Sequence, residues 1–292
     1  MLDWNDLRYL MAVADRGSAT AAARGLGVDK GTVSRRVAAL EHALGARLFD
    51  RRASGWTVTE AGRRALKAAR RCDSAATALQ ADLGGPGSVL RVPLRLTAPQ
   101  WFCTEILLPR IGRLRTLADW VDLNLSARSK VADLAEREAE IGLRNLRPPL
   151  GEFVVRKVGE LGSAIYASPD YLAARPPILT RDDFCREAFV AYPDRISYVP
   201  GFDWLNAAGL ASVLRVDDAA AIAAALRARA GLGVIPCYLG DRDPQLRRVT
   251  AQSCHETIWL VAPVDVAKTL AVKRVLAFVA EAFAANAAAL LG

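Results

Sequence analysis

The sequence predicts an α/β protein in which a small helical domain precedes a larger domain of alternating strands and helices. Three observations in this 292-residue chain support that fold class. Residues 3–44 place apolar side chains at helical spacing, residues 48–58 hold two short extended runs around a glycine, and residues after 88 alternate between strand and helix patterns. Such alternation is typical of layered α/β domains with mostly parallel sheets.

Residues 3–44 predict three short helices separated by tight turns. The apolar side chains of the first helix fall at i, i+3, i+4 and i+7 and share one face: Leu7, Leu10, Met11 and Ala14. Gly17 suits the end of this helix, and Ser18 suits the cap of a second helix. Asp29 suits the cap of the third helix, whose apolar stripe comprises Val33, Val37, Leu40 and Leu44.

The third helix presents a small, polar face opposite its apolar stripe. At about 100° per residue, the positions that point away from the stripe are Gly31, Ser34, Arg35 and Ala38. Such a face can approach the base edges of DNA closely while Arg35 reaches a guanine or a phosphate. Any amphipathic helix has a solvated face, so this pattern alone also permits a purely structural interpretation.

A basic hairpin follows the third helix. Residues 48–52 and 56–58 read as two short strands around Gly55, which places Arg51 and Arg52 beside a phosphate backbone. A helix, a turn, a second helix and a positively charged wing form the arrangement that enters a DNA major groove. The predicted DNA contacts are Lys30, Thr32, Ser34, Arg35, Arg36, Arg51 and Arg52.

A fixed pattern of small, apolar and charged residues runs through this region. It comprises Ala22, Ala23, Leu26, Val28, Val33, Ser34, Arg35, Val37, Leu40, Glu41, Leu44, Gly45, Leu48, Phe49, Arg51, Thr59 and Gly62. The pattern resembles the winged helix-turn-helix signature of LysR-type transcriptional regulators, which implies a sequence-specific DNA-binding regulator. The chain departs from the family at residues 29–32, where Lys30 stands in place of a Gln that usually reads bases. The operator sequence is therefore not predicted.

The charge of the chain favours an anionic partner. Residues 1–83 contain 14 of the 39 basic residues and 9 of the 31 acidic ones, which gives this segment a net charge of +5 out of +8. The positive charge is therefore concentrated where the helix-turn-helix lies, as expected for binding to double-stranded DNA.

Several classes of protein are disfavoured by the same sequence. The N-terminus lacks the pattern of a secretory signal and no apolar run has the length of a membrane span, so we expect a cytoplasmic protein without membrane contact. The five cysteines form no CxxC pair and only two histidines occur, so we expect no metal and no cofactor. No GxSxG, Walker A or dinucleotide-binding motif occurs, so we expect no catalytic residues.

Residues 59–83 predict one long helix capped by Thr59. Its apolar side chains follow a 4-3-4-3-4 spacing: Ala65, Ala69, Cys72, Ala76, Leu79 and Leu83. That repeat favours either a seam between two subunits or packing on the helix's own domain. The resemblance implies the first alternative, in a homodimer that pairs further into a homotetramer. The glycine-rich residues 84–88 then mark a domain boundary.

The second half of the chain alternates between strands and helices. Strands are expected at residues 89–97, 121–125, 141–143, 162–167, 189–192, 212–216, 232–235 and 259–262. Helices are expected at residues 101–117, 131–138, 170–174, 217–230 and 269–289. Residues 137–144, 166–172 and 231–236 resemble the effector-binding domain of the LysR family, a two-lobed fold similar to periplasmic binding proteins.

The resemblance implies three parts of the chain. The winged helix-turn-helix occupies residues 1–58, the linker helix and hinge residues 59–87, and the effector-binding domain residues 88–292. In that last domain, one lobe comprises residues 88–163 and 267–292, and the other residues 164–266.

Ligands of α/β folds bind beyond the carboxyl ends of the strands. The residues expected there are Thr97, Gln100, Ser126, Arg128, Arg144 and Tyr192. Thr97 aligns with a residue that commonly contacts effector in the family, and the Arg144 guanidinium suits a carboxylate. We therefore expect a regulator controlled by a small, anionic effector. The alternative is a redox-responsive regulator on the same scaffold that uses Cys103 or Cys237.

Overall fold

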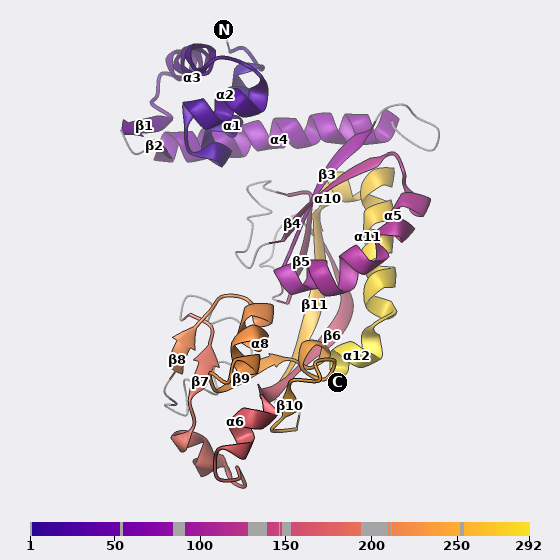
Figure 1. The fold of residues 1–292 in the computed structure, drawn as a ribbon. Coiled ribbons are helices and arrows are strands. Elements are labelled where there is room, and N and C mark those ends of the chain that lie inside the picture. Colours follow the sequence, from indigo (N-terminus) through magenta and orange to yellow (C-terminus); the bar gives the residue numbers. More distant parts are fainter. Residues whose placement is uncertain are drawn as a thin grey trace. The chain divides into compact units, whose positions relative to one another are not determined.

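The computed structural model describes residues 2–52, 55–83, 91–127, 139–145, 147, 153–193, 210, 212–251 and 254–292 (Figure 1). The chain divides between Gln80 and Ala81 into two compact units. The helix expected at residues 131–138 lies outside the described residues.

The first unit contains the expected helix-turn-helix. Its helices are α1 (Asp6–Arg16), α2 (Ala19–Leu26), α3 (Lys30–Leu44) and the start of α4 (Glu60–Leu83). Ser18 accepts a hydrogen bond from the Ala21 amide and Asp29 accepts one from the Thr32 amide, which confirms both predicted caps. Glycines in the left-handed conformation follow all three short helices: Gly17, Gly27 and Gly45.

The core of the first unit follows the predicted stripes with small shifts. Leu7, Leu10 and Val13 are the apolar residues of α1 that are buried, while Met11 and Ala14 pack at the margin of the core. Val33, Val37 and Leu40 of α3 are buried as predicted, but Leu44 is exposed. The stripe of α3 therefore leaves the core one turn before the helix ends.

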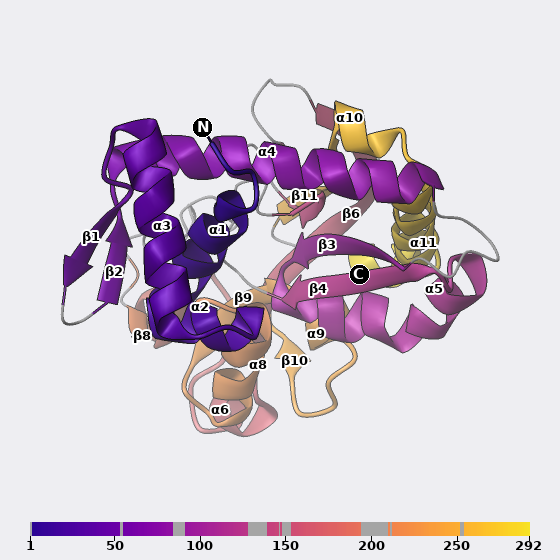
Figure 2. The same ribbon diagram turned by 90° about the horizontal axis from the view of Figure 1, so that it is seen from above.

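The wing consists of β1 (Phe49–Arg52) and β2 (Gly55–Val58), which pair antiparallel beside α3 (Figure 2). The Thr59 hydroxyl caps α4 by accepting from the Gly62 amide at 3.0 Å, and it donates to the Arg47 carbonyl at 2.7 Å. A side chain at Gly62 would place its Cβ 2.1 Å from the Leu48 carbonyl oxygen. Glycine at this position therefore lets α4 approach the loop that leads into the wing.

The second unit is a mixed α/β domain. Its strands are β3 (Val92–Ala98), β4 (Val121–Ala127), β5 (Ile141–Arg144), β6 (Phe153–Ala167), β7 (Phe189–Ala191), β8 (Ser212–Arg215), β9 (Leu232–Pro236), β10 (Arg247–Arg248) and β11 (Cys254–Pro263). Its helical segments are η1 (Phe102–Leu107), η2 (Leu108–Arg110), α5 (Ile111–Leu117), α6 (Pro169–Ala173), η3 (Arg181–Arg186), α8 (Ala219–Arg227), α9 (Cys237–Gly240), α10 (Val264–Ala267), α11 (Leu270–Ala284) and α12 (Ala287–Leu291).

The strands follow the order β4-β3-β5-β11-β6-β9-β7-β8, and β10 also pairs with β6. The strands β4, β3 and β5 are parallel, as are β9, β7 and β8, whereas β11 runs antiparallel to both β5 and β6. Residues 153–163 of β6 pair with β11, and residues 163–166 pair with β9. The long strand β6 thus takes part in both lobes of the domain.

Alternate residues of β6 pack on opposite faces of the sheet. Ile165 and Ala167 lie in one apolar cluster with Phe189 and Leu232. Ala164 and Tyr166 lie in another, with residues of α8. This alternation follows from the two-residue period of a strand whose two faces are both covered.

Several elements differ from the sequence expectations: the helix expected at residues 269–289 is interrupted between α11 and α12, and β11 starts at Cys254 instead of residue 259. The helix expected at residues 101–117 is divided into a π-helix, a 3-10 turn and α5, and the division falls at Pro109, which has no amide hydrogen to donate. The strand β6 begins at Phe153 instead of residue 162, and its first half, unlike the buried second half, mixes exposed and partly buried residues. Pro93 lies inside β3, at a position that pairs only with β4, because the pairing of β3 with β5 starts at Leu96. The missing amide hydrogen of Pro93 therefore costs no bond to β5.

Candidate DNA interface and effector site

The start of α3 holds three polar side chains in a chain of hydrogen bonds. The Thr32 hydroxyl donates to an Asp29 carboxylate oxygen at 2.6 Å and accepts from Arg35 Nη2 at 3.2 Å. The hydrogen bonds that Asp29 accepts from the Thr32 hydroxyl and amide lower the pKa of its carboxyl group. The cap therefore stays ionised, and it orients Arg35 along the exposed side of the helix.

Arg36 is directed toward α1. Its Nη1 atom lies 3.0 Å from Asp3 Oδ2 and 3.2 Å from Asp6 Oδ1. The Asp6 side chain is only 5% exposed, so Arg36 neutralises a nearly buried carboxylate. The structure thus places Arg36, a predicted DNA contact, in the packing of α3 against α1.

Arg51 is also paired within its own unit. Its Nη2 atom lies 2.6 Å from Glu41 Oε2, and its guanidinium lies 4.4 Å from the centre of the Trp56 ring. The other Glu41 oxygen accepts hydrogen bonds from the Leu48 amide at 2.8 Å and the Phe49 amide at 3.3 Å. Glu41 therefore ties the entry of the wing to α3.

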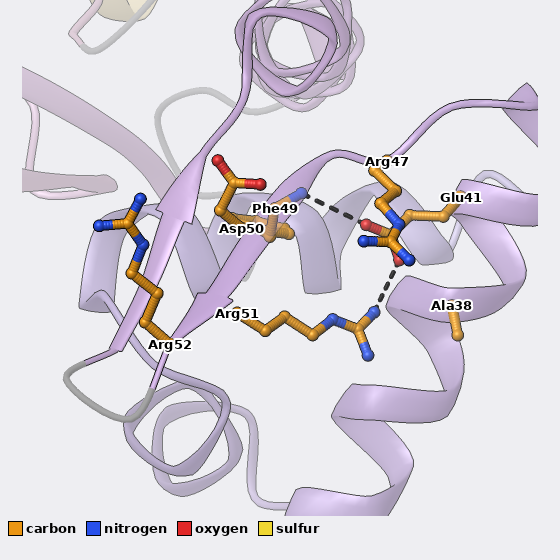
Figure 3. Close-up of a pocket in the computed structure, with 7 residues that line it drawn as sticks. All are labelled: Ala38, Glu41, Arg47, Phe49, Asp50, Arg51 and Arg52. Carbon is orange, nitrogen blue, oxygen red and sulfur yellow. Dashed lines mark hydrogen bonds and ion pairs between the residues drawn. The ribbon is translucent and has the colours of Figure 1, made fainter.

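A cavity of about 570 Å³ lies between α3 and the wing (Figure 3). It is lined by Ala38, Glu41, Arg47, Phe49, Asp50, Arg51 and Arg52. Figure 3 shows Arg51 reaching toward α3 and Arg52 pointing away from that helix. Arg47 was not among the predicted contacts, although its position just before a basic strand could have indicated it.

The predicted DNA contacts differ in whether their positive charge is already neutralised by an acidic residue of the protein. Lys30, Arg47 and Arg52 are exposed and form no ion pair with any other residue in the described part of the chain. Ser34 is partly buried on the same helix. The unpaired positive charge of this surface therefore comes from the start of α3 and from the wing.

The apolar repeat of α4 divides between two environments. Ala69 is 1% exposed in the core of its own unit, and Ala65 and Cys72 pack against the same core. Ala76 is exposed and Leu79 is 61% exposed, whereas the Leu83 side chain lies outside the described set. The first half of the predicted seam thus packs at least partly on its own domain.

An apolar groove of about 500 Å³ borders this helix. It is lined by Leu2, Trp4, Leu7, Leu44, Ala46, Leu48, Ala61, Arg64, Ala65 and Ala68. Trp4 is 66% exposed there, although it is a large apolar side chain. A groove of this kind is a typical surface for a protein partner.

In the second unit, the predicted effector contacts gather at the carboxyl ends of the parallel strands. Arg144 Nη2 donates to the Thr97 hydroxyl at 3.0 Å, and Arg144 Nη1 donates to the carbonyls of Thr97 at 2.9 Å and Leu143 at 2.7 Å. Ser126 is the register partner of Thr97 on β4. The structure therefore brings Thr97, Ser126 and Arg144 together at one edge of the sheet.

The other three predicted effector contacts have different surroundings. Gln100 is exposed at the start of the helical segment after β3. Tyr192 follows β7 and packs against the apolar clusters on that side of the domain. Arg128 lies outside the described residues.

A buried carboxyl group lies next to this edge and was not predicted. Glu256 is 5% exposed on β11 and accepts a hydrogen bond from Asn145 Nδ2 at 2.6 Å. Burial raises its pKa to about 7, although the Asn145 hydrogen bond lowers it. Residues 144 and 145 thus connect the end of β3, through Thr97, to the start of β11. No spacing in the sequence could have indicated this contact.

Two cysteines singled out from the sequence are fully buried. Burial raises the pKa of Cys103 to about 11, although the charge of Arg144 opposes the shift. Burial also raises the pKa of Cys237. Both groups are thiols at neutral pH.

The described residues hold neither a metal cluster nor a membrane-spanning helix. No cluster of His, Cys, Asp and Glu suited to a metal ion occurs among them. No helix in the same part of the chain is long and apolar enough to cross a membrane.

A winged helix-turn-helix joined to a two-lobed α/β domain defines a ligand-responsive transcriptional regulator. Residues 4–63 match the family of bacterial regulatory helix-turn-helix proteins of the lysR type. Residues 87–284 match the LysR substrate binding domain. The chain belongs to the LysR family of transcriptional regulators, which confirms the resemblance seen in the sequence. Members of this family bind DNA and small-molecule effectors, form oligomers and are not enzymes.

Individual proteins support this assignment. The Mau operon transcriptional activator of Paracoccus denitrificans is 28% identical over 294 residues, which cover 97% of each chain. An HTH-type transcriptional regulator of Xanthomonas campestris is 34% identical over 174 residues, but the match spans 58% of this chain and only about half of that relative, 49%. The structure of ArgP from Mycobacterium tuberculosis aligns over 97% of each chain with a TM-score of 0.68 at 22% identity, which supports the fold.

Arg36 and Arg52 should respond differently to replacement. Arg36→Ala leaves the nearly buried Asp6 carboxylate without its partner and should destabilise the first unit by about 1–3 kcal/mol. Arg52→Ala should leave the unfolding midpoint unchanged and reduce the slope of log K against log salt by about 0.9. Thermal unfolding and salt-dependent titrations of duplex DNA measure both effects. Equal effects of the two variants on stability would contradict this division.

Glu256 should make stability depend on pH. Its pKa is about 7 in the folded protein against an ordinary value of 4.5, so proton binding favours the folded state. Its stabilising contribution is full below about pH 4.5 and is lost as the pH rises through about 7. The loss amounts to about 3 kcal/mol relative to Glu256→Gln.

Unfolding midpoints of the wild type and Glu256→Gln between pH 4 and 8 test this expectation. The exposed Glu160 provides a matched control, because Lys157 lowers its pKa and Glu160→Gln should not remove the effect. Parallel pH profiles for the wild type and Glu256→Gln would contradict the prediction.

Proposed function

We propose that this regulator acts in the cytoplasm, binds promoter DNA through α3 and the wing, and is controlled by a small anionic effector between its two lobes. The unpaired cations that flank the exposed face of α3 carry the DNA part of this proposal. Lys30 lies at the start of that helix, and Arg47 and Arg52 lie at the wing. Positive charge on both sides of a helix with a small exposed face suits a groove bounded by phosphates.

The contacts divide between base reading and backbone binding. Arg35, Thr32 and Ser34 serve base edges and nearby backbone, with Arg35 preset by its hydrogen bond to Thr32. Lys30 serves a base edge or a phosphate. Arg52 binds a flanking phosphate. Arg51 also binds a flanking phosphate while it stays paired with Glu41. We assign Arg36 a role in the stability of the first unit because it forms ion pairs with Asp3 and Asp6.

For the functional parts, we propose the boundaries expected from the sequence. The DNA-binding domain comprises residues 1–58, the linker residues 59–87 and the effector-binding domain residues 88–292, with lobes at 88–163 plus 267–292 and at 164–266. A small carboxylate effector binds at the edge formed by Thr97, Ser126 and Arg144. The buried guanidinium of Arg144 supports this proposal, because it supplies positive charge in a site shielded from water.

Dimers form through α4, and pairs of dimers form the tetramer. A stripe of small or apolar residues along α4 is partly or fully exposed, Ala61, Ala65, Ala68, Ala76 and Leu79, and it continues into the groove beside Trp4. This stripe replaces the seam expected from the sequence, since Ala69 is buried in its own unit. A dimer presents two α3 helices to half-sites about one helical turn apart, or a multiple of that distance.

The redox alternative has weaker support. Thiolate is the reactive form of cysteine, and burial raises the pKa of both Cys103 and Cys237. Small-molecule control is therefore the favoured form of regulation.

The proposed DNA binding is tested by footprinting on the DNA upstream of the protein's own gene, at two salt concentrations. We expect protection of two neighbouring patches on one face of the duplex that survives competitor DNA. Arg35→Ala should weaken binding to this DNA by about 1–3 kcal/mol and have a smaller effect on random DNA. Equal losses on both DNAs would argue against base reading by Arg35.

The proposed dimer is tested by sedimentation of Leu79→Glu. A charged side chain at this exposed position should not disturb folding, but it should weaken a dimer by about 1–3 kcal/mol because an unpaired charge would be buried at the interface. Leu179→Glu is the control, since Leu179 is 83% exposed in the other unit. An unchanged dimer in Leu79→Glu would remove α4 from the interface.

A further inference from the structure

The orientation of the wing depends on contacts outside its own two strands. A two-stranded hairpin of four-residue strands is marginal in water by itself. The second strand is held to the turn between α1 and α2, because the Trp56 amide donates to the Gly17 carbonyl at 2.9 Å. The first strand is held to α3 by Glu41.

Glu41 uses both of its oxygens for this purpose. Oε1 accepts from two successive backbone amides, those of Leu48 and Phe49, and Oε2 pairs with Arg51 at 2.6 Å. The Glu41 side chain is only 14% exposed, so these interactions are partly shielded from water and salt. One carboxylate therefore fixes the backbone of β1 at its first residue and a side chain two residues later.

The position of β1 decides where the basic side chains of the wing lie. Phe49 packs in the core and against Trp56, with ring centres 5.5 Å apart, so any rotation of β1 would have to displace a buried ring. Arg47 precedes the strand and Arg52 ends it, and both line the cavity beside α3 (Figure 3). Their spacing from α3 is therefore set by the contacts of Glu41.

We propose that Glu41 is the positioning residue of the DNA interface: it holds the wing so that Arg47 and Arg52 meet backbone phosphates while α3 lies in the groove. This inference rests on the proposed DNA binding. It assigns to an acidic residue a favourable effect on binding to a polyanion, which is opposite to what its charge alone would produce. Simple electrostatics predicts tighter DNA binding when a carboxylate is removed.

The test measures how tightly full-length variants bind a duplex of approximately 40 base pairs at several salt concentrations. The duplex is long enough to span several half-sites. Glu41→Ala removes all three interactions. Glu41→Gln keeps an acceptor oxygen for the two amides. Glu60→Ala is the matched control, because Glu60 is an exposed carboxylate of the same unit that is also paired with an arginine, Arg63. Each variant has its unfolding midpoint measured in parallel.

We expect Glu41→Ala to bind about tenfold more weakly at low salt and to reduce the slope of log K against log salt by about 1.8, which corresponds to two lost phosphate contacts. Glu41→Gln should keep the wild-type slope, and Glu60→Ala should bind as tightly as the wild type or more tightly. A merely structural role would lower the unfolding midpoint of Glu41→Ala and leave the slope unchanged. Should Glu41→Ala not fold, Glu41→Asp, which withdraws the carboxylate from the amides, should show the shallower slope.

The outcomes separate this inference from the function on which it rests. Failure of the wild type to bind the duplex would overturn both. The positioning role alone would be overturned if the wild type binds but Glu41→Ala keeps the wild-type slope. The same holds for Glu41→Asp where that variant is used. A slope in Glu41→Gln as shallow as that of Glu41→Ala would do the same.

Discussion

The loop between α3 and the wing is the constraint on which the DNA-binding unit depends. Residues 47–49 receive polar contacts from two side chains, since Glu41 accepts from two of their amides and Thr59 donates to the Arg47 carbonyl. Gly62 in addition allows α4 to approach the Leu48 carbonyl. Hydrogen bonds to a charged group contribute about 1.5–3 kcal/mol each, so Glu41 stabilises this loop more than any neutral acceptor would. The fixed positions of the family signature in this region are thus explained by a single junction of α3, the wing and α4.

The electrostatics of the same unit follow from which cations are neutralised internally. A basic segment suggests that every arginine is available to DNA, but ion pairs within the fold alter that conclusion. Arg36 compensates the nearly buried Asp6, and Arg51 compensates Glu41, so each contributes little net charge to the surface. The cations without such partners include Lys30, Arg47 and Arg52, which flank α3. Pairing therefore changes where the positive charge of the unit is available without changing its total.

The effector domain uses buried polar pairs to connect neighbouring strands. Arg95 and the nearly buried Glu140 form an ion pair at 2.6 Å, Arg144 holds Thr97, and Asn145 holds Glu256. Polar groups in such positions are costly unless they are paired, so a ligand that replaces one partner changes the balance of the others. Because β11 pairs along β6, and β6 takes part in both lobes, a change at Glu256 would act on a strand that the lobes share. That is the physical basis on which a small molecule at the proposed site of Thr97, Ser126 and Arg144 would shift the lobes, provided that it binds the two arrangements with different affinity.

The features predicted from the sequence are those that depend on local spacing. The caps Ser18 and Asp29, the stripe of α3 and the hairpin required only residues a few positions apart, and each was found, except that Leu44 of the stripe is exposed. The features that were missed depend on distant partners. The apolar repeat of α4 has the same spacing whether it faces its own core or a second subunit, and only the burial of Ala69 distinguishes the two. Arg36 and Arg35 are adjacent on one helix, yet one faces Asp6 across the fold and the other faces Thr32 on the exposed side. A sequence pattern gives the direction of a side chain on its helix, but its role depends on what the rest of the fold places there.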